Sequence, residues 1–439
     1  MCVNSQSMQS HIHFIGIGGV GMSALAQAFL DRGYKVSGSD RLLATGQVTP
    51  VLETLKAQGV SLFPQDGSGI NAETIVVYST AIEVDNPDFA KAKSLNTVLL
   101  HRSEALAELS KGHRFIAVTG TCGKSSVTAM LGHLLTACGK DPTIVNGAEI
   151  SGLDEDGKRV GSVRTSTTLG GFFVAEADES DRSLMTLSPT DVIVTNASGD
   201  HFSKEEAETL FDAFRAKATG VVIDTRGYPV EPAPDGEGWE ARFTWRDKAC
   251  CLPMPGAHNV ANIKVALDMA LALGCDEDAL IAALPSFRGI RRRLERTGYC
   301  AGACVIDDYA HNIEKLAAAW TTLTQVFPKG VFGVWRPHGY APLRKMMEGL
   351  TEMFASVVRP CDHLLLLPVY DAGGTADRSI NSDTLFNQLR TRCPVTLVAD
   401  LTEAEKRLRE FAAPDTALAI FGARDPGLPV LARQLATNA

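Results

Sequence analysis

The chain has 439 residues, more than one hydrophobic core usually organises, so two or three domains are expected. Hydrophobic residues make up 45% and charged residues 21% of the chain, which is typical of a folded globular protein and excludes extensive disorder. Basic residues number 42 and acidic residues 51, a net charge of −9 without a polybasic block, so neither nucleic-acid nor membrane-surface binding is expected.

The N-terminus has no leader-like pattern, and no apolar run approaches the roughly 18–20 residues that span a bilayer. We therefore expect a cytoplasmic protein. Ten cysteines are scattered along the chain without a paired CxxC spacing, so the sequence predicts reduced thiols, not disulfides or a metal cluster.

The first hundred residues alternate strands and helices. Strands are predicted at 11–17, 34–38, 74–78 and 97–100, and a helix at 22–32, which is the rhythm of a parallel sheet. A glycine turn joins the first strand to the helix, and it would let a diphosphate approach the backbone at Gly16, Gly18, Gly19 and Gly21. Asp40 lies about twenty positions on and suits a ribose hydroxyl. NAD or FAD, another nucleotide and a purely structural turn all remain open at this point.

A second sheet begins with a predicted strand at 114–119, followed by Gly120-Thr-Cys-Gly-Lys-Ser125 and a helix at 126–138. A glycine-rich loop between a strand and a helix is typical of a phosphate-binding site. Lys124 would neutralise phosphate charge and the hydroxyl of Ser125 would bind Mg²⁺. The loop is shorter than the standard form, because Val118 stands where a further glycine is usual.

Acidic residues follow the next predicted strand, 172–176, in the run Glu176-Ala-Asp-Glu-Ser-Asp181. Beside a phosphate loop such a run predicts a Mg²⁺ site, and its alternative is a solvated acidic turn. The pair Asp200-His201 follows a further strand at 192–196, and His201 is a candidate metal ligand.

A third α/β unit opens near residue 286 with the arginine run 291–293. Its predicted strands are 303–307, 331–335, 364–368 and 418–421. The segment 229–240, rich in proline, glycine and acid, is expected to be an exposed loop.

Seven motifs occur in a fixed order: GIGGVGMSALA, GTCGKSSVTAM, EADESD, TN…DH, PGAHNVAN, RGIRRRLE and DDYAH. In this order they resemble the muramyl (Mur) ligase family, most closely its alanine-adding branch, and the resemblance covers residues 11–425. It implies a three-domain α/β architecture, with a Rossmann-like UDP-sugar domain over 1–109, a central P-loop ATPase domain over 110–285 and a Rossmann-like amino-acid domain over 286–439.

The resemblance also implies roles for individual residues. The UDP-sugar would be bound by Gly16, Gly18, Gly19, Gly21, Ser39, Asp40 and Arg102. ATP would be bound by Gly120, Thr121, Gly123, Lys124, Ser125, Ser126, His258, Asn259, Asn262 and Arg292, with Mg²⁺ on Ser125, Glu176 and His201. Catalysis would use Lys124, Glu176, His201, Arg293, Asp308 and His311, and the amino acid would contact His338, Arg344, Tyr370 and Arg378.

The implied reaction forms an amide between the carboxylate of UDP-N-acetylmuramate and an amino acid, L-alanine or another small one, in peptidoglycan precursor synthesis, with ATP and Mg²⁺ as cofactors. The implied state is a monomer or weak homodimer. Two arginines of the alanine-adding pattern are replaced by Gly339 and Pro342, so Arg336, Arg344 and Arg378 become the candidates for the amino acid carboxylate.

Smaller departures are Cys122, Ala257 and Asn312. Three alternatives stay open: a recycling ligase that attaches a peptide, an inactive UDP-sugar-binding paralogue, and a nicotinamide- or flavin-dependent oxidoreductase. The last leaves the loop at 120–125 and the acidic run without a role.

Overall fold

The computed structural model describes residues 10–153, 156–168, 170–198, 202–229, 238–371 and 377–437. The chain forms two compact units, and each is described by itself. The first unit comprises Met1–Pro229 and Asn262–Arg288, and the second comprises Val230–Ala261 and Gly289–Ala439. Among the helices in the described parts of the chain, none combines the length and apolar character needed to cross a lipid bilayer.

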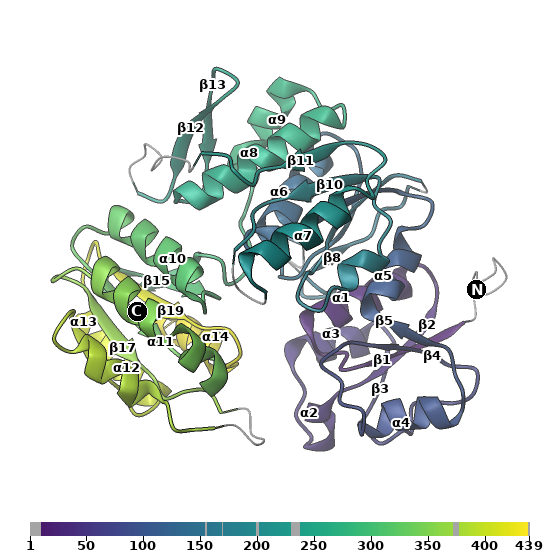
Figure 1. Ribbon diagram of the computed structural model, residues 1–439, viewed down its shortest axis with the longest axis horizontal. Helices are drawn as coiled ribbons and strands as arrows, with labels where there is room; N and C mark the ends of the chain where they lie inside the picture. Colours follow the sequence, from purple (N-terminus) through teal and green to yellow (C-terminus); the bar gives the residue numbers. More distant parts are fainter. Residues whose placement is uncertain are drawn as a thin grey trace. The chain divides into compact units, whose positions relative to one another are not determined.

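The first unit begins with a parallel sheet of five strands in the order β3-β2-β1-β4-β5 (Figure 1). The strands are β1 (His11–Ile15), β2 (Lys35–Ser39), β3 (Ser61–Phe63), β4 (Ile75–Tyr78) and β5 (Leu99–His101). The helices are α1 (Val20–Asp31), α2 (Arg41–Ala44), α3 (Pro50–Ala57), α4 (Pro87–Ser94) and α5 (Arg102–Ser110). Phe14 and Ile15 of β1 point into separate apolar clusters, so both faces of this sheet are covered.

A second sheet in the same unit has the order β11-β10-β6-β9-β7-β8, parallel except for the β7–β8 pair. The strands are β6 (Arg114–Thr119), β7 (Thr143–Val145), β8 (Val163–Arg164), β9 (Phe172–Glu176), β10 (Asp191–Val194) and β11 (Val222–Asp224). The helices are α6 (Lys124–Ala137), η1 (Ser183–Thr186), α7 (Lys204–Arg215), α8 (Ala257–Ala272), α9 (Glu277–Ala283) and η2 (Leu284–Ser286). By the division of the chain, α8 starts in the second unit and continues in the first.

The second unit has a parallel sheet extended by one antiparallel edge strand, in the order β14-β15-β19-β16-β17-β18. The strands are β14 (Glu295–Cys300), β15 (Ala303–Asp308), β16 (Val331–Trp335), β17 (His363–Leu366), β18 (Val395–Leu397) and β19 (Ala417–Phe421). The helices are α10 (Ile313–Val326), α11 (Tyr340–Val357), α12 (Ser382–Leu389), α13 (Leu401–Phe411) and α14 (Gly427–Thr437).

Alternating strand residues of this sheet feed two apolar clusters. Ile306 of β15 packs with α10 residues such as Trp320, whereas Val305 packs with α14 residues such as Leu431. Helices therefore cover both faces, which is why the strands read as continuous apolar runs in the sequence. The α/β architecture predicted from that pattern is confirmed.

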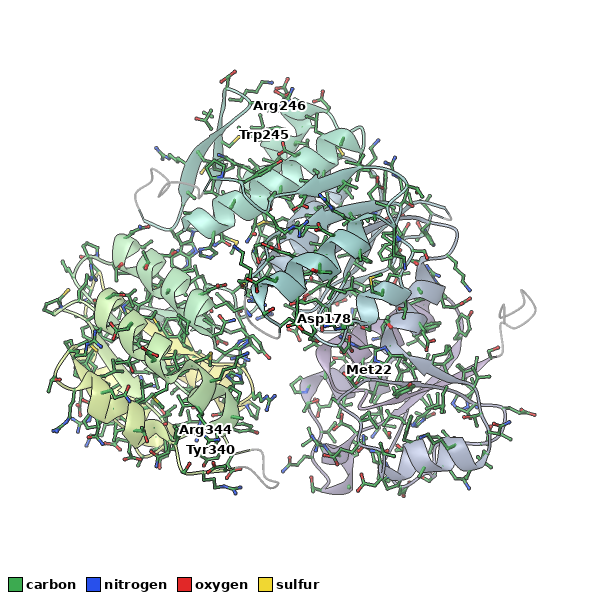
Figure 2. The ribbon with its side chains drawn as sticks, in the orientation of Figure 1. Met22, Asp178, Trp245, Arg246, Tyr340 and Arg344 are labelled. Atoms are coloured by element: carbon green, nitrogen blue, oxygen red, sulfur yellow. The ribbon has the colours of Figure 1, made fainter. Side chains whose placement is uncertain are left out.

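A two-stranded hairpin, β12 (Ala241–Trp245) and β13 (Lys248–Leu252), also belongs to the second unit and was not predicted. Its turn follows Trp245 and consists of Arg246 and Asp247, which have φ values of 49° and 61° (Figure 2). Two consecutive positive φ values fit a type I′ turn, for which Asn-Gly is the usual sequence signal. An Arg-Asp pair is not typical of this turn, so the sequence does not indicate the hairpin.

Asp191, the first residue of β10, holds one end of the second sheet together. Its carboxylate is buried and accepts two bonds from Arg114 of β6, at 2.8 Å from Nε and 2.9 Å from Nη2. It also accepts the backbone N–H of Val221, before β11, at 2.7 Å. One carboxylate therefore ties three neighbouring strands.

We expect Asp191→Ala to lower the free energy of unfolding of the full chain by about 3 kcal/mol, because it leaves the N–H of Val221 and an arginine without their acceptor. Asp191→Asn keeps one acceptor oxygen and should lose about half as much. Urea unfolding followed by circular dichroism measures both. Equal stability of Asp191→Ala and wild type would contradict this role.

Candidate functional site

The loop between β6 and α6 has the geometry of a phosphate-binding loop. Gly123 caps the N-terminus of α6 with φ 89°, a left-handed conformation that favours glycine. Gly120 has φ 124°, and a Cβ there would lie 2.1 Å from Oγ1 of Thr195. Hydrogen bonds fix the loop to the residues after β10: Asn196 accepts from the Cys122 N–H at 2.8 Å and donates to its carbonyl at 2.9 Å.

Two more predicted residues, Thr121 and Ser126, complete this region. The Thr121 N–H donates to the carbonyl of Asn196 at 3.2 Å, and Ser126 is buried in the first turn of α6. The loop is thus bonded on several sides, and the N-terminal N–H groups of α6 face the position that an anion would take.

Lys124 is the first residue of α6, and hydrogen bonds of its side-chain amine hold it in a largely buried position. Nζ donates to the Gly120 carbonyl at 2.8 Å and to Oε2 of Glu179 at 2.6 Å. Burial alone would lower the pKa of Lys124, but the charges of Glu179, Glu176 and Asp178 outweigh it and raise the pKa. The amine is therefore charged at neutral pH, as phosphate binding requires.

Ser125 and Glu176 place two oxygen donors side by side. Ser125 Oγ donates to Glu176 Oε2 at 2.9 Å, and the backbone N–H of Gly147 donates to the same oxygen at 2.9 Å. A hydroxyl and a carboxylate at the mouth of a phosphate loop are the hard oxygen ligands that Mg²⁺ prefers, so these residues fit the metal. His201, the third predicted ligand, and its neighbour Asp200 lie outside the described residues. Within those residues no group of three or more His, Cys, Asp or Glu side chains forms a metal site.

The N–H groups of the glycine turn after β1 form hydrogen bonds with nearby residues of the first sheet and with the turn itself. The N–H groups of Gly16 and Ile17 both donate to the carbonyl of Ser39, at 2.8 and 3.0 Å. The Gly18 N–H donates to Asp40 Oδ2 at 3.1 Å, and the Gly19 N–H donates to the Gly16 carbonyl at 3.1 Å. Asp40 thus orders the turn itself.

Ser39 likewise acts within the protein, because its buried hydroxyl donates to the buried carboxylate of Asp88. The groups left to meet a ligand are the N–H groups of the first turn of α1, from Val20 to Met22, which precede the first helical bond, from Ser23 to Gly19 at 2.8 Å.

A pocket of about 220 Å³ joins the two sheets of the first unit. It is lined by Gly21 of α1 and Arg102 of α5, and by Glu176 at the end of β9 and Asp178 just after it. Asp178 is labelled in Figure 2, together with Met22 of α1. Gly21, the predicted UDP-sugar residue Arg102 and the predicted metal ligand Glu176 therefore line one cavity.

In the second unit, Arg292 is engaged in holding the backbone. It has φ 59°, its Nε lies 3.2 Å from Asp307 Oδ2, and its Nη2 donates to the Gly422 carbonyl at 2.6 Å. Burial raises the pKa of Asp307 to about 6, against the opposing charge of Arg292. The guanidinium groups of Arg292 and Arg293 both lie near the Tyr309 ring, 5.0 and 5.7 Å from its centre, but the Arg293 side chain makes no hydrogen bond to any described residue. Of the two predicted phosphate arginines, Arg293 is the better placed to meet a ligand.

Asp308 is buried and accepts two backbone N–H groups, from Leu294 and Ala310, both at 2.7 Å. Burial raises its pKa, opposed by the charge of Arg293 and these two N–H groups. This bonding makes Asp308 an anchor for the loop that carries His311.

Nδ1 of His311 lies 2.9 Å from the Tyr309 carbonyl. Because a carbonyl can only accept, a neutral His311 ring carries its proton on Nδ1 and its lone pair on Nε2. The ring packs edge-on against predicted His338, at 5.0 Å between centroids.

The remaining predicted amino-acid-binding residues lie near the start of α11 and the segment after β17. Arg344, one turn after Tyr340 in Figure 2, pairs with Asp377 at 2.6 Å. Arg378 pairs with Asp371 at 2.7 Å and lies 5.7 Å from the Tyr340 ring centre.

Arg336 pairs with Asp425, and its guanidinium lies 5.9 Å from the ring centre of predicted Tyr370. Each of the three arginines proposed to replace the missing pair therefore already faces an acid.

The predicted adenine-side residues stand on the first turns of α8. In the first unit, the amide oxygen of Asn262 lies 2.6 Å from the position of a Cβ on Gly123, so Asn262 packs directly against the phosphate loop. In the second unit, the side chain of Asn259, in the first turn of α8, is buried and donates to the Pro255 carbonyl at 2.7 Å, which ties the helix to the residues before it. Burial lowers the pKa of His258 to about 4, and the charge of Arg293 adds to the effect.

Sequence reasoning placed the acidic run correctly beside the loop but did not single out its second and third acids. Asp178 pairs with Arg102 at 2.6 Å, and Glu179 pairs with Lys124. Both acids belong to the run after β9, so the sequence does place them near the site. Their cationic partners depend on how the two sheets pack together, and the spacing of residues along the chain does not predict those partners.

We expect Gly123→Ala to weaken ATP binding at least tenfold, because a Cβ at φ 89° is strained and would lie 2.6 Å from the Asn262 amide oxygen. Gly139→Ala is the matched control: it changes a residue with φ 71° after the other end of α6, and its Cβ would meet nothing within 4 Å. Calorimetric titration with ATP compares the two variants. Equal ATP affinities would contradict the proposed loop geometry.

Because the pKa of His258 is lowered in the folded protein, the free energy of unfolding should fall at acidic pH. The folded state keeps the ring neutral down to about pH 4, whereas the unfolded ring protonates near 6.5, so stability from this group is complete above pH 6.5 and is lost as pH falls toward 4. Between pH 7 and 5, wild type should lose up to about 2 kcal/mol more unfolding free energy than His258→Gln. Urea titrations at the two pH values test this, and parallel losses would refute it.

Comparisons with known proteins identify the family of the chain. A model described as "Mur ligase family, catalytic domain" matches residues 11–114, and one described as "Mur ligase, glutamate ligase domain" matches residues 292–424. The chain is 32% identical to the UDP-N-acetylmuramate–L-alanine ligase of Maricaulis maris, over 87% of this chain and 86% of that protein. It is also 32% identical to the enzyme of that name from Geobacter sp., over 94% of each.

Solved structures share the fold. The UDP-N-acetylmuramate–alanine ligase of Thermotoga maritima superposes with a TM-score of 0.79 at 24% identity, covering 98% of both chains. A murein peptide ligase from Psychrobacter arcticus gives a TM-score of 0.67 at 19% identity, also over 98% of both chains. These matches extend through the whole three-domain architecture. The chain is a member of the Mur ligase family.

Proposed function

We propose that this ligase uses ATP to form an amide between the carboxylate of UDP-N-acetylmuramate and L-alanine or another small amino acid, in peptidoglycan precursor synthesis. The observation that carries the proposal is the pocket of the first unit, where Gly21 and Arg102 face Glu176 across one cavity next to the phosphate loop. The names of the relatives at 32% identity support the same reaction. The division into domains at 1–109, 110–285 and 286–439 is part of this proposal.

In the first unit, the first turn of α1 and Arg102 would bind the UDP diphosphate, and Lys124 would bind the phosphates of ATP. Ser125 and Glu176, with His201, would hold Mg²⁺, which when bound screens phosphate charge and polarises the transferred phosphoryl group. Nζ of Lys124 already donates to the Gly120 carbonyl and to Glu179, which leaves its third N–H for a phosphate of ATP.

The reaction follows from charge. A carboxylate is a poor electrophile, so phosphoryl transfer from ATP first converts it to an acyl phosphate, and ADP leaves. The neutral amine of the amino acid then attacks the carbonyl, and phosphate departs after a tetrahedral oxyanion.

In the second unit, Arg293 would stabilise phosphoryl charge, and His311, oriented by the contact between its Nδ1 and the Tyr309 carbonyl, would assist removal of the amine proton. Asp308 would act by holding the loop that carries His311, since both of its oxygens already accept backbone N–H groups.

One observation favours a second candidate acceptor, a peptide in place of a single amino acid. Gly339 and Pro342 replace two arginines, and Arg344 and Arg378 are each paired with an acid at 2.6 and 2.7 Å. An acceptor carboxylate must therefore compete with Asp377 or Asp371 for a cation. A peptide acceptor, as in murein peptide recycling, carries its carboxylate elsewhere and would avoid this competition.

The proposal predicts ADP release from Mg²⁺-ATP that depends on UDP-N-acetylmuramate and on an acceptor. A coupled ADP assay with single amino acids and the muropeptide tripeptide measures it, and Lys124→Met is the inactive control, expected to lose at least 10²-fold. Turnover with L-alanine supports wall synthesis, and turnover only with the tripeptide transfers the enzyme to recycling. Without any turnover the chain would be a UDP-sugar-binding paralogue.

A further inference from the structure

Arg102, the first residue of α5, spans the pocket of the first unit with its guanidinium fork. Nη2 donates to Asp178 Oδ2 at 2.6 Å, on the wall formed by the second sheet. Nη1 lies 3.7 Å from the position of a Cβ on Gly21, in the first turn of α1. One edge of the fork is thus held by an acid, and the other edge faces the helix N-terminus.

Asp178 is itself held in place. Its Oδ1 accepts from the Ser180 N–H at 3.3 Å and its Oδ2 from the Ser180 hydroxyl at 3.1 Å. The side chains of Arg102 and Asp178 are 28% and 33% exposed, so water screens the pair only in part.

The first turn of α1 has the N–H groups that an anion needs but carries no charge of its own. Its capping residue is Gly19, which offers no side-chain cap, and the turn contains no acidic residue. A diphosphate there would accept from the N–H groups of Val20 to Met22 and gain from the helix dipole. Full neutralisation needs a cation, and the Nη1 edge of Arg102 faces this position.

We propose that Asp178 is a positioning residue for the UDP-linked substrate: it holds one edge of the Arg102 fork so that the other edge meets the diphosphate at the first turn of α1. This rests on the proposed function in so far as the substrate is a nucleoside diphosphate. Asp178 lies two residues after Glu176, so the segment that ends β9 serves the metal with one acid and the nucleotide with the next.

The test is the affinity of the purified full chain for UDP alone, measured by calorimetry without ATP or amino acid. Asp178→Asn removes the charge that fixes the fork and should weaken UDP binding about tenfold. Arg102→Met should weaken it at least as much. The double variant should bind UDP no more weakly than Arg102→Met alone, because Asp178 acts only through Arg102.

Arg102→Lys supplies a second route, because lysine keeps the positive charge but cannot hold Asp178 and the diphosphate with one planar fork. It should lose about tenfold in UDP affinity, as Asp178→Asn does. In turnover, Asp178→Asn should raise the KM for the UDP-linked substrate about tenfold and the KM for ATP less than twofold. A purely structural role for Asp178 would lower thermal stability without this selective rise.

The matched control is Asp141→Asn, which breaks another ion pair of the same unit, with Arg164 at 2.5 Å and both side chains 28% exposed. It should reduce thermal stability and leave UDP affinity unchanged. Unaltered UDP affinity in Asp178→Asn, or losses that add in the double variant, would overturn the inference.

The inference and the proposed function fail separately. If the wild-type chain binds UDP with this dependence on Arg102 and Asp178 but releases no ADP with any acceptor, the positioning role stands and the ligase reaction fails. If the wild-type chain turns over but UDP affinity ignores both residues, the reverse holds.

Discussion

The bonding between the phosphate loop and the end of β10 is the constraint on which the site depends. Asn196 bonds both the N–H and the carbonyl of Cys122, and Thr195 leaves no room for a side chain at Gly120. Two neighbouring parallel strands end at the same edge of their sheet, so a loop after one can be fixed by residues after the other. The start of α6, with Lys124 and Ser125, is set by that contact.

Charge balance is the second organising feature. The acidic segment after β9 supplies Glu176 to Ser125, Asp178 to Arg102 and Glu179 to Lys124. Arg102 and Lys124, the two cations of this unit proposed to meet phosphates, are thus each paired with a carboxylate in the free protein. The arrangement avoids unpaired buried charge before a phosphate binds.

Much of the fold could be predicted because apolar strands and glycine loops leave local signals, as at β6 and Gly120 to Ser125. The type I′ turn at Arg246-Asp247 left none. At the site, the motifs indicated which residue types gather but not their partners. That Asp40 bonds Gly18, that Arg292 is bound to the Gly422 carbonyl and that Asp178 faces Arg102 are outcomes of tertiary packing. Spacing along the chain does not encode them.

The contrast between Arg292 and Arg293 affects how inactivating alleles are read. Arg292 joins a positive φ to bonds with Asp307 and the Gly422 carbonyl, so its replacement removes a support of the fold. Within the described parts of the chain, the side chain of Arg293 makes no hydrogen bond to the backbone, and its guanidinium lies near the Tyr309 ring. Under the phosphate role proposed for Arg293, a genetic screen scored only on growth would give the two neighbours the same phenotype, although losing Arg292 would deplete the folded protein and losing Arg293 would leave folded protein without activity.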